Sequence, residues 1–307
     1  MTLYRIINAS APTRICDLGG WTDTWFAGQG YVLNIAVQPC AEVQILVYPH
    51  GSGIERIVLN VENYAERYTP GESYRHALLE ATCDELGFPD DVSVEISIFS
   101  EMPSGASTGT SAAVTIALIG ALAALNGRSI SAYAAATYAH AIETRRLGLQ
   151  SGIQDQLCSA YGGICFIDMQ HYPHASVSPL QLPGHVLWEL EQRMLLVFLG
   201  KAHSSSALHE QVIAGLEQQG PAAQALLPLR AAALHGRNAL LRADLKDFGA
   251  AMQANTDAQR ALHAALVCAE SEEIIALAQQ HNAWGWKING AGGDGGSLSI
   301  LCGPSAT

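Results

Sequence analysis

The stretch Glu101-Met-Pro-Ser-Gly-Ala-Ser-Thr-Gly-Thr-Ser-Ala-Ala-Val114 joins a loop of small and hydroxyl residues to an apolar segment that ends at Asn126-Gly127. Glycine lets a backbone approach a ligand closely. The first N–H groups of a helix have no partner inside the helix and lie at the positive end of its dipole. The stretch therefore predicts either an anion site, usually for phosphate, or an ordinary helix with a Ser or Thr cap.

Composition places the chain among globular proteins. Its 307 residues are 49% hydrophobic and 14% charged, which is enough to bury a large core and predicts two domains. The formal net charge of −12 argues against nucleic acid or an anionic membrane as a partner, because both bind basic surfaces. A local site for a phosphate-bearing ligand remains compatible with this charge.

Cysteine usage and the N-terminal sequence predict a cytoplasmic protein. The seven cysteines are scattered and contain no CxxC pair, so neither a zinc site nor a disulfide framework is expected. The N-terminal residues lack the charged-then-apolar order of a signal peptide. The longest apolar run, at 112–125, is too short to span a bilayer and predicts a buried helix.

Strand and helix patterns are mixed without regular alternation, which predicts an α+β fold. The expected strands are 5–7, 32–37, 42–48, 92–98, 163–168, 194–199 and 297–302. The expected helices are 72–86, 111–125, 131–147, 205–217, 222–241, 247–266 and 271–281. A stretch rich in proline, histidine and serine at 171–185 predicts a linker, so the expected domains are 1–182 and 183–307.

Two glycine-rich segments carry polar residues. In Ala11-Pro-Thr-Arg-Ile-Cys-Asp-Leu-Gly-Gly-Trp-Thr-Asp23, the glycine pair predicts a tight turn that presents a carboxylate, or else a strand turn with a capping aspartate. Residues 290–295 satisfy GxGxxG, but a strand is expected after them where a dinucleotide fingerprint needs a helix. The second segment is therefore predicted to let backbone approach a ligand.

The loop at 103–113 is not a Walker A loop, because GxxxxGK[ST] is absent and no lysine follows. Phosphate would have to be held by backbone N–H groups, hydroxyls and the helix end. Thr110 or Ser111 could also ligate Mg²⁺, a cation that prefers oxygen.

Two carboxylates are candidates for chemistry. Glu143 lies in the predicted helix at 131–147, where the alternative is a solvated helix face. Asp155 follows twelve residues later in Gln150-Ser-Gly-Ile-Gln-Asp-Gln156, a glycine-containing turn in which it is either a cap or a base.

Taken in this order, the segments resemble the GHMP kinases, the family of galactokinase, homoserine kinase and mevalonate kinase. The family's phosphate loop PxGxGLGSSAA stands here as Pro103-Ser-Gly-Ala-Ser-Thr-Gly-Thr-Ser-Ala-Ala113, and its KxxGAGGGG motif as Lys287-Ile-Asn-Gly-Ala-Gly-Gly-Asp-Gly295. The segment at 11–23 is similar to the sugar-kinase opening, and Ser151-Gly-Ile-Gln-Asp-Gln156 to the galactokinase-type segment with the catalytic aspartate. Within the family, Gly19-Gly-Trp-Thr-Asp-Thr24 most resembles the branch of fucokinase and D-glycero-D-manno-heptose 7-phosphate kinase, which phosphorylate an anomeric hydroxyl.

The resemblance implies a two-domain GHMP kinase-like fold with the active site in the cleft between the domains. It implies ATP-dependent phosphorylation of a sugar hydroxyl, with Asp155 as the base, Arg14 beside it, and Ser111 and Glu143 as Mg²⁺ ligands. The implied ATP-binding residues are Pro103, Gly105, Ala106, Ser107, Thr108, Gly109, Thr110 and Ser111. The implied substrate-binding residues are Gly20, Thr22, Asp23, Gly290, Ala291, Gly292 and Gly293. Sugar and ATP are the expected partners, and a homodimer is compatible with the resemblance.

Several residues depart from the family pattern. Ser107, Thr108 and Thr110 replace glycine, leucine and serine, and Asp294 replaces a glycine where its charge would repel ATP unless it points away or meets Mg²⁺. His203 stands where heptose kinases tend to have an arginine, which weakens the expectation of a phosphorylated sugar. The alternatives are a catalytically silent sensor of nucleotide or sugar, and a kinase for a non-sugar alcohol.

Overall fold

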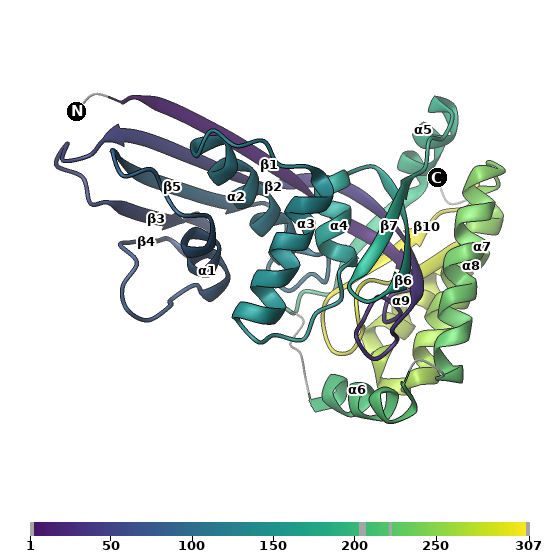
Figure 1. The fold of residues 1–307 in the computed structure, drawn as a ribbon. Coiled ribbons are helices and arrows are strands. Elements are labelled where there is room, and N and C mark those ends of the chain that lie inside the picture. Colours follow the sequence, from purple (N-terminus) through teal and green to yellow (C-terminus); the bar gives the residue numbers. More distant parts are fainter. Residues whose placement is uncertain (1–2, 203–206, 221–222, 305–307) are drawn as a thin grey trace. The chain divides into compact units, whose positions relative to one another are not determined.

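The computed structural model describes residues 3–202, 207–220 and 223–304 (Figure 1). The chain forms two compact units that interleave along the sequence, and the expected division after residue 182 stays a prediction. His203 lies outside the described residues. Within the described ranges, no helix is both long and apolar enough to cross a membrane. Unit 1 comprises Met1–Thr13, Val37–Met102 and Gly109–Gly162; unit 2 comprises Arg14–Ala36, Pro103–Thr108 and Gly163–Thr307.

The strands of unit 1 run in the order β4-β3-β5-β2, with β3 parallel to β5 and the other neighbours antiparallel. In β5, the isoleucines and valines from Val94 to Ile98 are buried while the residues between them are partly exposed, as the two-residue period of a strand requires. Strands β1 and β2 contribute residues to both units. The bounds are β1 Arg5–Leu18, β2 Gly30–Pro49, β3 Ile57–Val61, β4 Glu66–Tyr68 and β5 Val92–Ser100.

Helix α2 is the centre of the helical layer of unit 1. It is apolar on all sides and is largely buried against α1, α3, α4 and β5, because such a helix has no face suited to water. Ser131 caps α3 by accepting a hydrogen bond from the Ala134 N–H over 3.2 Å. The bounds are α1 Ala77–Leu86, α2 Thr110–Leu125, α3 Ala132–Ala141 and α4 Gln154–Tyr161.

Unit 2 contains the strand order β2-β6-β7 and a second antiparallel sheet, β8-β10-β9. Helices α7 and α8 pack along each other (Figure 1), and α8 lies against β9. A Cβ atom on Gly285 would lie 2.3 Å from the Gly249 carbonyl oxygen, so this close approach requires glycine. The bounds are β6 Ile164–His171, β7 His174–Pro179, β8 Met194–Phe198, β9 Gly285–Ile288, β10 Ser297–Leu301, α5 Gly184–Arg193, α6 Ala207–Gln219, α7 Leu227–Leu241, α8 Leu245–Leu262 and α9 Ala269–Gln280.

The structure confirms the mixed α+β class and corrects three local expectations. The expected linker at 171–185 contains strand β7, whose pairing with β6 overrides the weak local signal of a proline-rich stretch. The helix expected over 131–147 is α-helical only to Ala141 and continues as a π-helical turn. Asp155 lies in the first turn of α4 and not in a glycine-containing turn.

Candidate active site

Arg14 is buried on β1 and binds the phosphate loop, defined here as residues 103–108. Its Nη1 donates to the Ser107 carbonyl oxygen over 2.5 Å, and its main-chain N–H donates to the Thr108 carbonyl oxygen over 2.8 Å. The guanidinium also lies 3.7 Å from Asp17 Oδ1. Because a planar guanidinium donates in fixed directions, Arg14 holds the backbone of the loop in place. Its expected pairing with Asp155, a residue of unit 1, stays a prediction.

The phosphate loop uses left-handed backbone at a residue that is not glycine. Ser107 has a φ of +57°, between Gly105 at +73° and Gly109 at +68°. A side chain in this region costs about 1–2 kcal/mol relative to glycine. Ser107 therefore occupies the position of the family's glycine with a strained backbone. Strained backbone of this kind clusters at functional sites.

The start of α2 is not an ordinary capped helix. Its N-cap is Gly109 in left-handed conformation, a residue without a side chain that could cap the helix, and its first turn carries no acidic residue. Ser111 is exposed in that first turn, whereas Ala106 and Thr108 in the loop before it are buried. The capped-helix alternative is therefore wrong, and the helix start retains the features of an anion site.

The turn after β1 is held together by its own hydroxyls. Thr22 Oγ1 lies 2.7 Å from the Gly19 carbonyl oxygen within the turn and 3.1 Å from the carbonyl oxygen of Tyr31 on β2. Trp21 has a φ of +76° and packs into a buried apolar cluster of unit 2. Asp23 is only 2% exposed. These contacts give Thr22 a structural role, while the expected sugar contacts of this turn stay predictions.

The glycines of the C-terminal motif, residues 287–295, lie against different parts of unit 2. Gly290, with a φ of +67°, faces the phosphate loop, because a Cβ atom there would lie 3.1 Å from Ser107 Cβ. At Gly292, with a φ of +82°, a Cβ atom would lie 2.4 Å from the Leu266 carbonyl oxygen, so packing alone requires glycine there. His209 Nε2 donates to the Gly292 carbonyl oxygen over 2.9 Å. Of these two glycines, only Gly290 lies against the phosphate loop.

Asp294 points to solvent. Its carboxylate lies 3.5 Å from Lys201 Nζ, and its side chain is 74% exposed. Lys201 also pairs with Glu270 over 2.7 Å. Lys201 therefore offsets the negative charge of Asp294, the residue that replaces a glycine of the family motif.

Glu143 is not on a solvated helix face. It lies in the π-helical turn Ile142–Arg146, where its carboxylate accepts hydrogen bonds from Gln156 Nε2 over 2.6 Å and from Ser151 Oγ over 3.1 Å. Burial raises the pKa of Glu143, and the charge of Asp155 raises it further. The two carboxylates predicted from sequence are thus electrostatically coupled within unit 1, and the π turn is a feature frequent at functional sites.

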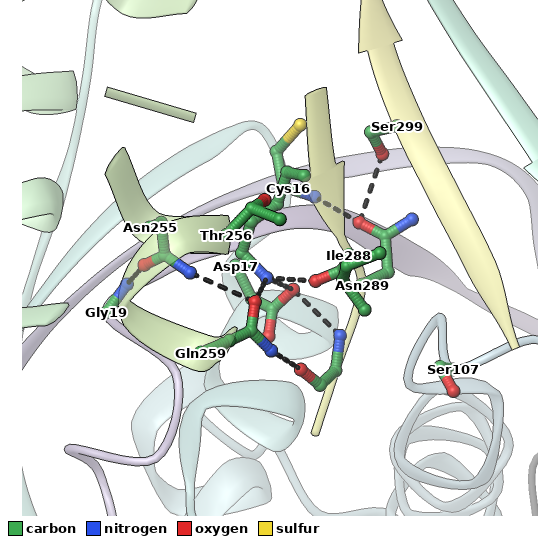
Figure 2. A network of polar contacts seen from close by, with 12 residues as sticks. Cys16, Asp17, Gly19, Ser107, Asn255, Thr256, Gln259, Ile288, Asn289 and Ser299 are labelled. Carbon is green, nitrogen blue, oxygen red and sulfur yellow. Dashed lines mark hydrogen bonds and ion pairs between the residues drawn. The ribbon is translucent and has the colours of Figure 1, made fainter. Parts of the chain in front are cut away.

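Sequence reasoning assigned no role to Asp17 and Lys287, which form a buried ion pair beside Arg14. Lys287 Nζ lies 3.3 Å from Asp17 Oδ1, and both side chains are fully buried. Figure 2 shows Asp17 at the centre of a polar network that includes Gln259. The sequence offered one signal for this pair: Asp17 lies in the segment 11–23 and Lys287 in the segment 287–295. A lysine that is buried needs a partner of opposite charge.

Two family models match the chain, GHMP kinases N terminal domain over residues 73–163 and GHMP kinases C terminal over residues 237–306. The chain belongs to the GHMP kinase family. This confirms the family and the two-domain GHMP kinase-like fold expected from the motifs, whereas the placement of the active site in a cleft stays a prediction.

Curated relatives of this GHMP kinase include proteins named for sugar phosphorylation. Over 94% of its length it is 28% identical to the bifunctional fucokinase/GDP-fucose pyrophosphorylase of Arabidopsis thaliana, of which it covers 29%. Over 66% of its length it is 26% identical to the D-glycero-alpha-D-manno-heptose 7-phosphate kinase of Campylobacter jejuni, of which it covers 60%. The chain therefore spans less than two thirds of either relative.

Solved structures share the fold of this GHMP kinase. A D-glycero-D-manno-heptose 1-phosphate kinase from Bacteroides thetaiotaomicron matches with a TM-score of 0.72 at 20% identity, covering 98% of this chain and 89% of that one. The galactokinase of Lactococcus lactis matches with a TM-score of 0.74 at 16% identity, covering 98% and 86%. At these identities the likeness concerns the fold alone.

GHMP kinases use ATP as phosphate donor. No cluster of three or more His, Cys, Asp or Glu side chains suited to a metal occurs among the described residues. Mg²⁺ in kinases commonly takes one or two protein carboxylates, with phosphates and water completing its shell. Glu143, Ser151 and Asp155 offer only oxygen atoms as ligands, and a cation would offset the Asp155 charge that, after burial, raises the pKa of Glu143.

Glu143→Gln is expected to stabilise the ligand-free protein as pH rises. Because the folded state raises the pKa of Glu143, its contribution to the free energy of unfolding is fully present below the unfolded pKa near 4.5 and is lost as pH rises through the folded value. The variant lacks this loss, so its melting temperature should rise relative to that of the wild type as pH increases above about 4.5. Thermal melts across this range test the expectation, with the exposed Glu273→Gln as control; a pH-independent difference would contradict it.

Proposed function

We propose that this GHMP kinase transfers the γ-phosphoryl group of ATP to a hydroxyl of a hexose, deoxyhexose or heptose, at the anomeric position. The observation that carries the proposal is the coupled pair of Glu143, held by Ser151 and Gln156, and Asp155 at the start of α4. The Glu143 carboxylate is suited to binding Mg²⁺, and the Asp155 carboxylate is suited to accepting a proton. Phosphoryl transfer asks mainly for positioning and charge stabilisation, which such a set can supply.

The roles follow from the chemistry of each residue. Asp155 accepts the proton of the sugar hydroxyl while the oxygen of that hydroxyl attacks the γ-phosphorus and the bond to the ADP oxygen breaks. Arg14 holds the phosphate loop and stabilises negative charge that develops during transfer. Glu143 would hold Mg²⁺, which would offset the negative charge of the phosphates during transfer. The start of α2 receives phosphate oxygens on its N–H groups.

The names of the relatives support a sugar as acceptor. The match to the fucokinase-containing plant protein extends over 94% of the chain, and a heptose 7-phosphate kinase matches over 66%. The second candidate is a non-sugar alcohol, since the mevalonate kinase of Pyrococcus furiosus is 29% identical over 67% of the chain. The longer match favours the sugar. A cytoplasmic location and a homodimer remain expectations.

A substrate panel tests the proposal. Purified protein with MgATP would be offered free sugars, hexose and heptose phosphates, mevalonate and homoserine in a coupled ADP assay, with the product identified by phosphorus NMR. We expect sugar-dependent ADP release and an anomeric phosphate signal. Turnover on mevalonate or homoserine alone would favour the second candidate, and nucleotide binding without turnover on any acceptor would favour a silent sensor.

A further inference from the structure

Lys287 is a fully buried lysine whose ammonium group has an acceptor for each of its three protons. Its Nζ donates to Asp17 Oδ1 over 3.3 Å, to Gln259 Oε1 over 3.0 Å and to the carbonyl oxygen of Ile288. Lysine carries three donors and no acceptor, so these contacts satisfy the group completely. Such a site is costly to build in a protein interior, because the charge must leave water.

Two partners of Lys287 hold the backbone of Gly290 at its N–H and at its carbonyl oxygen. Asp17 Oδ1 accepts a hydrogen bond from the Gly290 N–H over 2.9 Å. Gln259 Nε2 donates to the Gly290 carbonyl oxygen over 2.9 Å. Lys287 therefore contacts both side chains that fix Gly290, the glycine of the C-terminal motif at which a Cβ atom would lie 3.1 Å from Ser107 Cβ.

The same partners reach the other motif segments of unit 2. Asp17 lies 3.7 Å from Arg14 Nη1, and Arg14 in turn binds the phosphate loop. Gln259 Oε1 accepts from Asn255 Nδ2 over 3.2 Å, and Asn255 Oδ1 accepts from the Gly19 N–H over 2.7 Å. Figure 2 shows Gly19, Asn255 and Gln259 beside Asp17. One connected set of contacts thus joins the glycine turn, Arg14 and Gly290.

We propose that Lys287 is a positioning residue of the phosphoryl transfer. It touches no substrate. It fixes Asp17 and Gln259, and through them the Gly290 backbone, the Arg14 guanidinium and the turn at Gly19. Removing the ammonium group takes away the buried cation that Asp17 Oδ1 contacts, and breaking a buried ion pair in this way is strongly destabilising, so all three segments should loosen together. The kinetic part of this inference rests on the proposed function, whereas its structural part does not.

The test is Lys287→Met, which keeps an unbranched side chain and removes the three donors. The matched control is Thr256→Val, which removes a buried hydroxyl of α8 that donates to the carbonyl oxygens of Met252 and Trp286 over 3.2 and 3.1 Å and keeps the ion pair of Lys287 with Asp17. Should Lys287→Met fail to fold, Gln259→Met removes the donor to the Gly290 carbonyl oxygen and keeps the ion pair. Each variant would be measured by hydrogen exchange and by steady-state kinetics.

We expect amide exchange over residues 286–296 and 103–108 to accelerate about tenfold or more in Lys287→Met and not in Thr256→Val. In the same comparison kcat should fall about 100-fold, with KM for ATP and sugar within about threefold. Exchange and kcat changes no larger than those of Thr256→Val would overturn the proposal, as would accelerated exchange with unchanged kcat. If the wild type shows no sugar-dependent turnover, the proposed function fails, and the exchange result alone decides whether Lys287 holds Gly290.

Discussion

Asp155→Asn is expected to lower kcat by about 10³-fold and to leave ATP affinity within about threefold of the wild type. The amide matches the carboxylate in size and cannot accept the proton of the acceptor hydroxyl. ATP affinity should persist because the phosphate loop and the start of α2 are unchanged. The coupled ADP assay gives kcat, and calorimetric titration with ATP gives the affinity.

Asp91→Asn is the matched control for this substitution, because Asp91 is an exposed residue of the same unit. It should retain wild-type kcat and wild-type ATP affinity. If Asp155→Asn retained wild-type kcat as well, Asp155 would not be the base. If it lost ATP affinity together with turnover, the residue would serve nucleotide binding instead.

Arg14→Lys is expected to lower kcat by about 100-fold and the free energy of unfolding by about 1–3 kcal/mol. Lysine has one ammonium group where arginine has a planar fork, so it cannot reproduce the geometry that binds the Ser107 carbonyl oxygen beside Asp17. The phosphate loop should therefore lose its fixed backbone although the charge is kept. Steady-state kinetics and chemical denaturation measure the two effects.

Arg5→Lys provides the control, because Arg5 lies on the same strand in an exposed position. It should change kcat by less than about twofold and the free energy of unfolding by less than about 0.5 kcal/mol. An Arg14→Lys variant as active and as stable as Arg5→Lys would show that the guanidinium geometry does not matter.

Much of the framework was predictable because its causes are local. The apolar composition of 111–125 predicted a buried helix, and α2 occupies Thr110–Leu125. The small residues before it predicted a loop at a helix start, and the left-handed backbone at Gly109 bears this out. The order of the motifs predicted the family, since glycines and carboxylates recur there at fixed intervals. Each of these features depends on residues close together in the chain.

The remaining features depend on contacts between distant residues. Asp17 and Lys287 pair across most of the chain length, and neither periodicity nor spacing signals such a contact. Asp155 was expected in a turn because the glycine before it was visible, whereas α4 begins only at Gln154 and its packing against α2 and α3 is tertiary. Glu143 was compatible with a solvated face until its hydrogen bonds to Ser151 and Gln156 were known.

The measurement that tests the central claim most directly is ADP release by the wild-type protein at saturating MgATP, with and without a sugar acceptor. We expect ADP release only in the presence of sugar, in a one-to-one ratio with phosphorylated sugar, and its loss in Asp155→Asn. ADP release at the same rate without sugar would contradict it, as would the absence of turnover with every sugar in the panel.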